Sequence, residues 1–553
     1  MMIAASESQF AELDAWIARR LEHDGIPGLS LAITTATETI YVRGHGLADA
    51  AAKTPVEAHH LFEIGSVGKA FTAMLLLRMQ ERGQIDLHRP VTDYLPWFSV
   101  QSEYEPITSH HLLTHTAGLI VGSDVAADGR FETWYLRETE VSGPPGTVSI
   151  ESNVGYKTLG YLIENVIGKN YSDAVTEEIL KPLGMHDSIT PITNRDRPRI
   201  ATSHRRLHDD RPNRYGDPLV SATWIQTWSA DGSIACTPGD YAIFARALMH
   251  RAADLVSEES FAHMIADYSN GGFDGDPDDT YGYGLVTWRD KSDRFLYGHG
   301  GSMVGNYSQL TIDPEAKIGV VGSVNGPASA GPYVNAVLDF TRALLAGETP
   351  ELPEIRSRLL IDDADDYIGE YSNDTITCEL IAENGGLVLA WEDQRVALEQ
   401  RRKDTFWADH PALVHNYLVA ERENELVSAL HFGRYWLGKA GLSHAVIAPI
   451  PDEWSIYTGW YRCHNPWLGV IRILERRGAL ILVEHGYETK LFDLGNGQFR
   501  IGDAPSPERL TFDAIADGVA LRANFNSQAY YRTPASSVES GVFVREQKST
   551  ALN

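Results

Sequence analysis

Apolar residues near the start of the chain recur with the period of an α-helix. Phe10, Leu13, Trp16, Ile17 and Leu21 alternate with charged and polar residues, and positions three or four apart share one face of a helix. The pattern predicts an amphipathic first helix. Because the start has no basic residues and only a short apolar run, we expect a mature N-terminal segment rather than a secretory leader.

Helix-like and strand-like patterns then alternate as far as about residue 345. The predicted helices are 66–83, 156–168 and 238–250. The predicted strands are 29–42 (two strands joined by a turn at 35–38), 281–288, 307–312 and 318–324. Strands at both ends with helices between them predict an α/β (α+β) domain, in which a central antiparallel sheet is flanked by helices.

The pattern changes in the last third of the chain, where short alternating segments are separated by Gly, Asn and Asp turns. The sequence Tyr-Ile-Gly-Glu-Tyr at 367–371 returns as Tyr-Thr-Gly-Trp-Tyr at 457–461, and strand-like runs follow both copies. One unit copied once predicts two small, closed, lipocalin-like β-barrels. The expected organisation is a first domain at 1–345, a linker at 346–365, and β-barrels at 366–450 and 451–553.

Charge and composition narrow the range of partners. The chain has 553 residues, a hydrophobic fraction of 43% and a net charge of −28, so it has ordinary apolar content but is strongly acidic. An acidic surface repels polyanions, and we therefore expect neither nucleic acid nor an anionic membrane as the main partner. No stretch approaches the ~20 apolar residues that span a bilayer.

The cysteines provide neither a covalent framework nor a metal site. Cys236, Cys378 and Cys463 are far apart in the sequence, which fits neither a disulfide framework nor a zinc site. We expect reduced thiols, as in a cytoplasmic protein. Since the sequence shows no ligand cluster with metal spacing, we expect no metal and no cofactor.

Ser66 and Lys69 are the first candidates for chemistry. Residues three apart on a helix lie on the same face, so the Ser66 hydroxyl and the Lys69 amine can meet. A serine needs a base to become a nucleophile, and a desolvated lysine can serve as that base. The alternative is a serine that caps the helix and an exposed lysine, because this spacing also occurs by chance.

The surrounding sequence carries a family resemblance. Residues 62–72 read FEIGSVGKAFT, and GQIDL at 83–87, VTDYLP at 91–96 and ITSHHLLTHTAGL at 107–119 follow in order. Together they resemble the serine β-lactamase-like, penicillin-recognising hydrolases, which include class C β-lactamases, DD-carboxypeptidases, esterases and D-aminopeptidases. The resemblance covers about residues 8–345. It implies a β-lactamase-like catalytic domain with Ser66 as the nucleophile and Lys69 as its base.

The second motif of this family has an unusual form here. The family usually has a tyrosine two residues before an asparagine, whereas this chain has Glu151 and Asn153 at those positions. The resemblance implies that Asn153 orients the substrate amide and the lysine, and that Tyr156 is structural. Glu151 could relay protons in place of the tyrosine, because a carboxyl group accepts and donates at one position. Alternatively, Glu151 pairs with Lys69 and keeps that lysine charged.

The third motif consists of His299, Gly300, Gly301 and Ser302. Class C β-lactamases and carboxypeptidases have Lys-Thr-Gly at this place, and His-Gly-Gly is similar to the D-aminopeptidase and esterase branch. Glycines in a strand let a substrate backbone approach closely. The resemblance implies an oxyanion hole formed by the backbone N–H groups of Ser66 and Ser302. It also implies that His299 polarises the site or binds substrate; the alternative is a histidine packed at a strand end.

Two further features receive no catalytic role. His115 belongs to a segment that resembles a structural motif behind the site. A basic cluster on an insertion could hold a substrate carboxylate, although a solvated loop is the favoured interpretation. Its members are Arg195, Arg197, Arg199, Arg205, Arg206, Arg211 and Arg214.

The resemblance implies a serine hydrolase that cleaves an amide or peptide bond through an acyl-enzyme on Ser66. The His-Gly-Gly motif and the two β-barrels favour a peptidase for short peptides with D- or non-standard residues, similar to D-aminopeptidases or to enzymes that degrade linearised cyclic peptides such as microcystin. The expected partner is a small peptide or amide, and a homo-oligomer is possible. The alternatives are a carboxylesterase, an acyl transferase and a catalytically silent small-molecule-binding protein. β-Lactamase activity is less expected, because two motifs are altered.

Overall fold

The structure is a computed structural model, which describes residues 7–122, 129–270, 278–447 and 449–533. The chain forms two compact units. The first unit comprises Met1–Leu207 and Pro218–Glu354, and the second comprises His208–Asp217 and Ile355–Asn553. The second unit therefore includes one short segment that lies within the sequence of the first.

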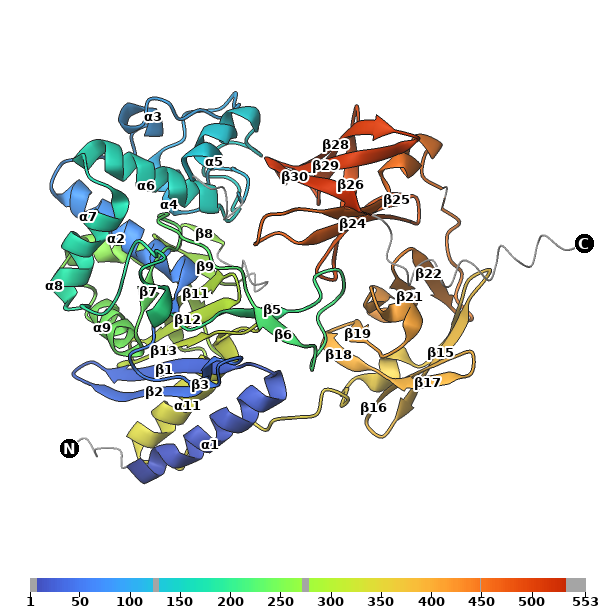
Figure 1. Ribbon diagram of the computed structural model, residues 1–553, viewed down its shortest axis with the longest axis horizontal. Coiled ribbons are helices and arrows are strands. Elements are labelled where there is room, and N and C mark those ends of the chain that lie inside the picture. Colours follow the sequence, from blue (N-terminus) through green and yellow to red (C-terminus); the bar gives the residue numbers. More distant parts are fainter. Residues whose placement is uncertain (1–6, 123–128, 271–277, 448, 534–553) are drawn as a thin grey trace, which may run out of the picture. The chain divides into compact units, whose positions relative to one another are not determined.

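The first unit is built on one sheet with the strand order β3-β2-β1-β13-β12-β11-β10-β9-β8 (Figure 1). The two ends of this unit's sequence meet where β1 pairs antiparallel with β13 and Ile33 lies opposite Val320. The prediction of a central antiparallel sheet is confirmed. Its strands are β1 (Gly28–Thr35), β2 (Thr39–Asp49), β3 (Thr54–Pro55), β8 (Ser269–Asn270), β9 (Thr280–Tyr281), β10 (Val286–Arg289), β11 (Phe295–Met303), β12 (Asn306–Asp313) and β13 (Ile318–Val324).

Helices cover both faces of this sheet. A Cβ on Gly319 of β13 would lie 3.2 Å from the Ala245 side chain, and a Cβ on Gly322 would lie 2.9 Å from the Val334 side chain. Side chains alternate between the faces of a strand, so the helices that carry Ala245 and Val334 lie on opposite faces. The helices are α1 (Glu7–Asp24), α2 (Gly68–Glu81), α3 (Val91–Tyr94), α4 (Ser109–Leu113), α5 (Gly129–Tyr135), α6 (Asn153–Ile167), α7 (Tyr171–Val175), α8 (Lys181–Leu183), α9 (Pro238–Met249), α10 (Glu258–Met264) and α11 (Gly331–Ala346).

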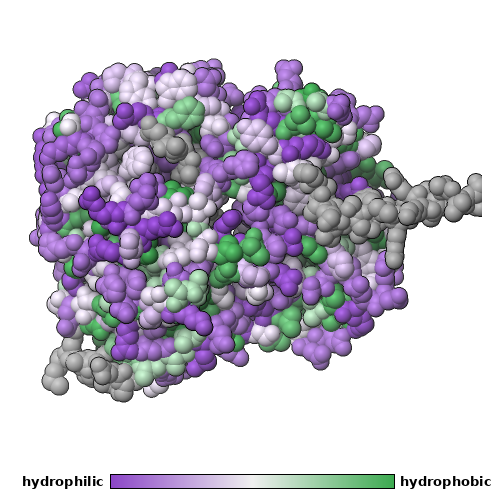
Figure 2. All heavy atoms as spheres, viewed as in Figure 1, coloured by the Kyte–Doolittle hydropathy of each residue, from purple (hydrophilic) through white to green (hydrophobic). Residues whose placement is uncertain are grey.

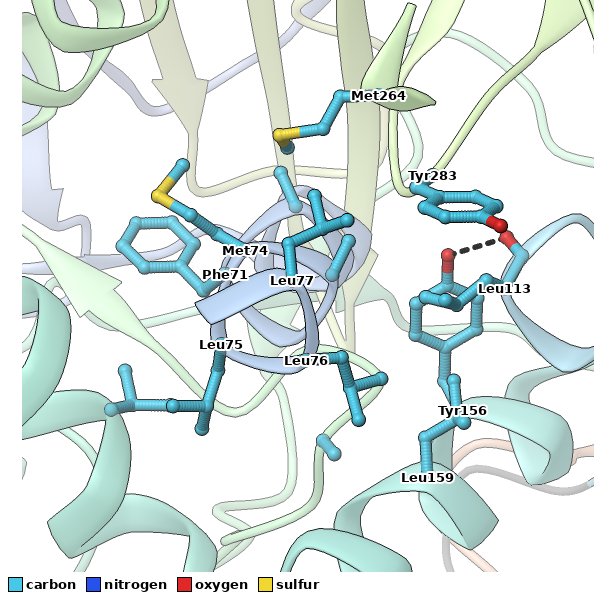
Figure 3. Packing of buried hydrophobic residues seen from close by; sticks show 14 of the residues in the cluster. Phe71, Met74, Leu75, Leu76, Leu77, Leu113, Tyr156, Leu159, Met264 and Tyr283 are labelled. Carbon is cyan, nitrogen blue, oxygen red and sulfur yellow. Dashed lines mark hydrogen bonds between the residues drawn. The ribbon is translucent and has the colours of Figure 1, made fainter. Parts of the chain in front are cut away.

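Helix α2 lies at the centre of the hydrophobic core. Nearly all of its residues are buried, and the Phe71 ring stacks on that of Phe244 with 3.9 Å between centroids. A helix that is apolar on all sides is typical of a buried position. Side chains leave the helix in several directions in Figure 3, namely Phe71, Met74, Leu75, Leu76 and Leu77. A short 3-10 turn, Gly65–Val67, precedes α2 and carries Ser66. The candidate nucleophile therefore lies directly before the N-terminus of a tightly packed helix.

One predicted strand is divided in two. Residues 281–288 form the end of β9 and most of β10, and the backbone reverses between them, where Gly282 N donates to Leu285 O at 2.9 Å. Gly284 in this turn has a φ of +74°, which favours glycine. A Cβ at Gly284 would lie 2.6 Å from the Lys69 carbonyl oxygen. The turn therefore packs directly on the start of α2.

The second unit holds the predicted β-barrels. Strands β23–β30 close into a barrel in sequence order, whereas β14–β22 form a nine-stranded sheet whose two edges are β17 and β18. The first barrel is thus nearly closed. Its strands are β14 (Gly369–Ser372), β15 (Thr377–Glu383), β16 (Gly386–Trp391), β17 (Gln394–Ala397), β18 (Glu399–Arg402), β19 (Thr405–Trp407), β20 (Leu418–Glu423), β21 (Leu426–Phe432) and β22 (Tyr435–Lys439). The closed barrel consists of β23 (Gly459–Arg462), β24 (Val470–Arg476), β25 (Ala479–Glu484), β26 (Tyr487–Gly495), β27 (Gln498–Ile501), β28 (Arg509–Ala516), β29 (Val519–Phe525) and β30 (Gln528–Thr533).

The sequence repeat extends to individual hydrogen bonds. The Tyr371 hydroxyl donates to the Tyr367 carbonyl oxygen at 2.6 Å, and the Tyr461 hydroxyl donates to the Tyr457 carbonyl oxygen at 2.8 Å. The glycine between each pair of tyrosines has a φ of +145° in one copy and +146° in the other. The repeated motif therefore makes the same turn at the start of both barrels.

The segment His208–Asp217 comes from the predicted basic insertion and is held within the second unit. Asp209 accepts two hydrogen bonds from the Arg462 guanidinium, at 2.7 and 2.9 Å. Arg401 donates to the Asn213 carbonyl oxygen at 2.6 Å. Bidentate arginine–carboxylate pairs are geometrically specific, so this segment is a fixed part of the second unit.

The predicted arginine cluster is divided by this arrangement. Arg211 pairs with Asp210, and Arg214 pairs with Asp217, both inside the segment. Arg205 and Arg206 instead belong to β5 (His204–Arg206), which pairs with β6 (Leu219–Ser221) in the first unit. The arginines of the segment thus serve local ion pairs.

One face of the molecule is mainly hydrophilic (Figure 2). Figure 2 shows a face on which hydrophilic residues dominate and apolar residues form small, scattered patches. Among the described helices, none has the length and apolar character needed to cross a membrane. The three cysteines are buried and unpaired.

Candidate active site

Ser66 and Lys69 meet at the start of α2. The Lys69 Nζ lies 2.7 Å from the Ser66 Oγ, and the lysine side chain is 0% exposed. An ammonium group has three N–H donors, and two further acceptors complete the set: Asn153 Oδ1 at 2.7 Å and Glu151 Oε1 at 3.3 Å. The alternative of an exposed lysine therefore does not apply, and four of the sequence-predicted residues form one cluster.

Glu151 and Asn153 are positioned by the start of α6. Ser152 caps this helix by accepting a hydrogen bond from the Gly155 backbone N–H at 3.1 Å, so Asn153 is the first helical residue. The Ser152 backbone N–H donates to His115 Nδ1 at 3.0 Å. Burial lowers the pKa of His115 to about 3, which keeps the ring neutral and Nδ1 free to accept. His115 thus positions the segment that carries Glu151, in line with its structural interpretation.

The Glu151 carboxylate is ionised in this arrangement. Its side chain is 33% exposed. Burial is the largest influence and opposes the charge, but the charge of Lys69, smaller effects of His115 and His299, and the hydrogen bond from Lys69 together outweigh it, and the pKa of Glu151 falls to about 2. The resting site therefore holds Glu151 as an ion pair with Lys69, which corresponds to the second of the two interpretations of this carboxylate.

We expect Glu151→Gln to lower kcat/KM at pH 7 by about 10²-fold or more, because acid–base groups typically contribute 10²–10⁴-fold and the buried Lys69 loses its carboxylate partner. Steady-state kinetics with the best substrate found would measure this loss. Since the pKa of Glu151 is about 2, its titration should leave no limb in the wild-type pH profile between about pH 4 and about pH 9. Glu151→Tyr, which restores the family residue, is the companion variant. An unchanged rate in Glu151→Gln would contradict a role for this carboxylate.

Strand β11 brings Ser302 beside the residue that precedes the nucleophile. A Cβ on Gly65 would lie 2.6 Å from the Ser302 backbone nitrogen, and a Cβ on Gly301 would lie 2.0 Å from the Ile64 carbonyl oxygen. Neither position has room for a side chain, so both glycines are required for the backbones to approach. This contact places Ser302 beside Gly65, the residue that directly precedes Ser66.

His299 is held by hydrogen bonds at both ring nitrogens. Its Nδ1 contacts the Gly300 carbonyl oxygen, which can only accept, so Nδ1 carries the proton. Its Nε2 lies 3.1 Å from the Tyr281 hydroxyl and accepts from it. Burial, with a smaller effect of Lys69, lowers the pKa of His299 to about 4. This geometry favours a role for neutral His299 in positioning the Gly300 peptide, rather than a role in contacting substrate.

Tyr281 is the site residue that the sequence interpretation did not identify. The residue falls inside a predicted strand, and no motif marks its hydroxyl as a partner of His299. Its contact joins β9 and β11, which are separated in the sheet by β10. A contact of this kind depends on strand order, which the alternating pattern alone does not fix.

Tyr156 does not replace the missing family tyrosine. Its ring centroid lies 5.7 Å from the Lys69 Nζ, but its hydroxyl donates to the Leu113 carbonyl oxygen at 2.8 Å (Figure 3). Burial raises the pKa of Tyr156 well above its ordinary value, so the phenol does not ionise. The structure agrees with the expectation that Tyr156 is structural.

The described side chains of the candidate site do not form one of the arrangements that hold metal ions. Within the described ranges, no group of three or more His, Cys, Asp or Glu side chains is arranged to hold a metal ion. The cluster places the Ser66 hydroxyl, the Glu151 carboxylate and the Asn153 amide within hydrogen-bond distance of one nitrogen, Lys69 Nζ.

Comparison with known proteins identifies relatives of this chain by sequence and by structure. The family model described as Beta-lactamase matches residues 13–340. Penicillin-binding protein 4 of Amycolatopsis lactamdurans is 26% identical over 357 residues, which cover 61% of this chain and 90% of that protein. The octameric penicillin-binding protein homologue from Pyrococcus abyssi is similar in structure, with a TM-score of 0.57 and 25% identity over 78% of this chain and 99% of that chain.

EstCE1, a hydrolase with promiscuous acyltransferase activity, shares the fold with a TM-score of 0.51 at 20% identity, over 59% of this chain and 96% of its own. The family match spans more than half of the chain and contains Ser66, Lys69, Glu151, Asn153 and the His299–Ser302 motif. On this evidence the chain belongs to the beta-lactamase family and is a serine hydrolase.

Proposed function

We propose that the protein hydrolyses an amide bond in short peptides through an acyl-enzyme on Ser66. The observation that carries this proposal is the 2.7 Å distance between Lys69 Nζ and Ser66 Oγ, with the Lys69 side chain fully buried. A nucleophile within hydrogen-bond distance of a group that exchanges protons is the arrangement that covalent catalysis needs.

The proposed reaction has two halves. Lys69 first passes one ammonium proton to the Glu151 carboxylate, and the resulting neutral amine accepts the Ser66 proton as Oγ attacks the carbonyl carbon. The N–H groups of Ser66 and Ser302 stabilise the oxyanion. The C–N bond then breaks as the same proton passes to the leaving amine. In the second half, water attacks the acyl carbon, the pair accepts its proton, and Ser66 leaves with that proton.

We further propose a substrate with D- or non-standard residues. The altered second and third motifs favour a peptidase over a β-lactamase, and the relatives named penicillin-binding proteins support an amide substrate. The octameric homologue from Pyrococcus abyssi supports a homo-oligomer, which is likewise a proposal for this chain.

Product analysis by mass spectrometry tests the proposal. Wild type and Ser66→Ala are incubated with D- and L-aminoacyl amides, short linear peptides, a p-nitrophenyl ester and a penicillin. We expect amide cleavage by the wild type that Ser66→Ala lacks. Cleavage of the ester alone would instead assign a carboxylesterase, and cleavage of no substrate would favour a silent binding protein. Added amine or alcohol nucleophiles distinguish acyl transfer from hydrolysis.

A further inference from the structure

A cavity of about 380 Å³ lies in the first unit, beyond the cluster of Ser66, Lys69 and Glu151. The end of β2, the short strand β4 (Phe62–Glu63), residues 197–203 and 221–225, and the turn after β11 form its walls. Its volume falls within the range of small-molecule sites. No step of the proposed reaction uses it.

The cavity is lined by residues that are close in sequence to Ser66 and Ser302. Glu63 lines it and precedes Ser66 by three positions, and Met303 lines it and directly follows Ser302. An extended chain spans at most ~3.6 Å per residue, so the Cα of Glu63 lies within about 11 Å of the Cα of Ser66. The cavity wall and the candidate active site are therefore neighbours along both β4 and β11.

Glu63 is a buried carboxyl group with few partners. It is 7% exposed, and the hydrogen bond that the structure gives it comes from Asn306 Nδ2 at 3.3 Å. The Asn306 Oδ1 is itself buried and has no hydrogen-bond partner among the described residues. Burial raises the pKa of Glu63 to about 7. Keeping a carboxyl group buried with one long hydrogen bond costs free energy. A carboxyl group of this kind in the wall of a cavity indicates that it binds a ligand.

The other polar groups of the cavity favour a cationic ligand. Asp49 is a second carboxylate, and the Ala52 backbone N–H holds its pKa below the ordinary value. Burial and then the neighbouring His59 lower the pKa of His60, so this imidazole is neutral near pH 7. Arg197 is exposed to solvent and stacks on the Trp224 ring at 5.5 Å. The interior therefore has acidic groups with no buried cation among the residues that line it.

We propose that this cavity binds the free ammonium group of an aminoacyl substrate, with Glu63 as the buried counter-charge and Asp49 as a second acidic group. Trp224 and Met303 supply apolar walls for the attached side chain. The inference rests on the proposed function and deepens it, because it makes a free amine the feature that distinguishes substrates. A blocked amine would bring no charge to Glu63 and would fill the cavity with an acyl group.

Calorimetric titration of the full-length Ser66→Ala protein tests this proposal without turnover. The probes are D- and L-phenylalaninamide and the N-acetyl derivative of each. We expect at least one phenylalaninamide with a free amine to bind 10- to 100-fold more tightly than its N-acetyl derivative. This difference is about what a hydrogen bond to a charged group contributes. Glu63→Gln in the same background should abolish that difference. Glu57→Gln is the matched control, because Glu57 is 61% exposed on the same segment and does not line the cavity.

Equal binding of free and acetylated amides, binding of neither, or a preference that persists in Glu63→Gln would each overturn the proposal. Asp49→Asn provides a second variant on a less buried residue if Glu63→Gln does not fold, and it should weaken the preference at least several-fold. Failure of the proposed function shows itself separately, as wild-type protein without Ser66-dependent turnover, because the titration does not depend on catalysis.

Discussion

Ser66→Ala is expected to lower kcat/KM for the best amide substrate by at least about 10⁴-fold, because removing the nucleophile of a covalent mechanism removes its whole acid–base sequence. Single-turnover and steady-state assays would measure the loss, and a fluorophosphonate should label the wild type but not the variant. Ser99→Ala, at an exposed serine, is the control for a general effect of removing a hydroxyl group. Residual activity within about tenfold of the wild type would exclude Ser66 as the nucleophile.

Two variants at Lys69 separate its charge from its proton transfer. Lys69→Met removes the amine and leaves Asn153 Oδ1 and Glu151 Oε1 without the donor that they now share. Lys69→Arg keeps a positive charge but cannot give up its proton, since an arginine stays charged in proteins. We expect both variants to lose activity to a similar extent. If Lys69→Arg restored most of the rate, Lys69 would serve as a fixed charge and not as a proton carrier.

The sequence alone was sufficient for features that depend on local spacing. Ser66 lies on the 3-10 turn that leads into α2 and Lys69 lies in the first turn of α2, so their contact follows from a separation of three residues. Gly301 could be placed near the nucleophile because its motif has a known position in the resembling family. The repeated Tyr-x-Gly-x-Tyr segments likewise predicted two similar barrels, since the turn that they make is local.

Features that depend on long-range packing were out of reach. From the sequence, the pairing of Glu151 with Lys69 was only one of two alternatives, because the residues lie 82 positions apart and their spacing does not fix a contact. The partner of His299 depends on the order of strands in the sheet. The residues that form α11 were assigned to no element, although their apolar positions follow a helical period, and the segment His208–Asp217 shows no sign in its composition that it belongs to the second unit.

A buried ion pair behind the site gives the largest expected effect on stability. Lys157 on α6 and Glu132 on α5 are each 3% exposed and in direct contact, and Asp231 Oδ2 lies 3.9 Å from the Lys157 Nζ. Breaking a buried pair by removing one partner typically costs 3–5 kcal/mol, because the other charge stays buried. We expect Lys157→Met to cost about this much in the free energy of unfolding.

Glu132→Gln should cost less than Lys157→Met, because Asp231 remains near Lys157. Urea unfolding followed by circular dichroism would measure both variants and the double variant, which should recover part of the loss since no buried charge is left unpaired at Glu132. Lys169→Met, in the exposed pair with Glu177, is the control and should change little. Equal losses in the buried and exposed pairs would contradict the argument.

Lys157→Met should also reduce activity in the folded protein, and the reason lies in the backbone. Gly232 follows Asp231, and a Cβ on Gly232 would lie 2.8 Å from the Gly65 carbonyl carbon. The turn that Lys157 helps to anchor thus packs against the residue before Ser66. A shift of this turn moves the nucleophile relative to Ser302, and misplacement by about 1 Å can cost about 10²-fold in rate. Wild-type kcat in a destabilised Lys157→Met protein would show that the ion pair serves stability alone.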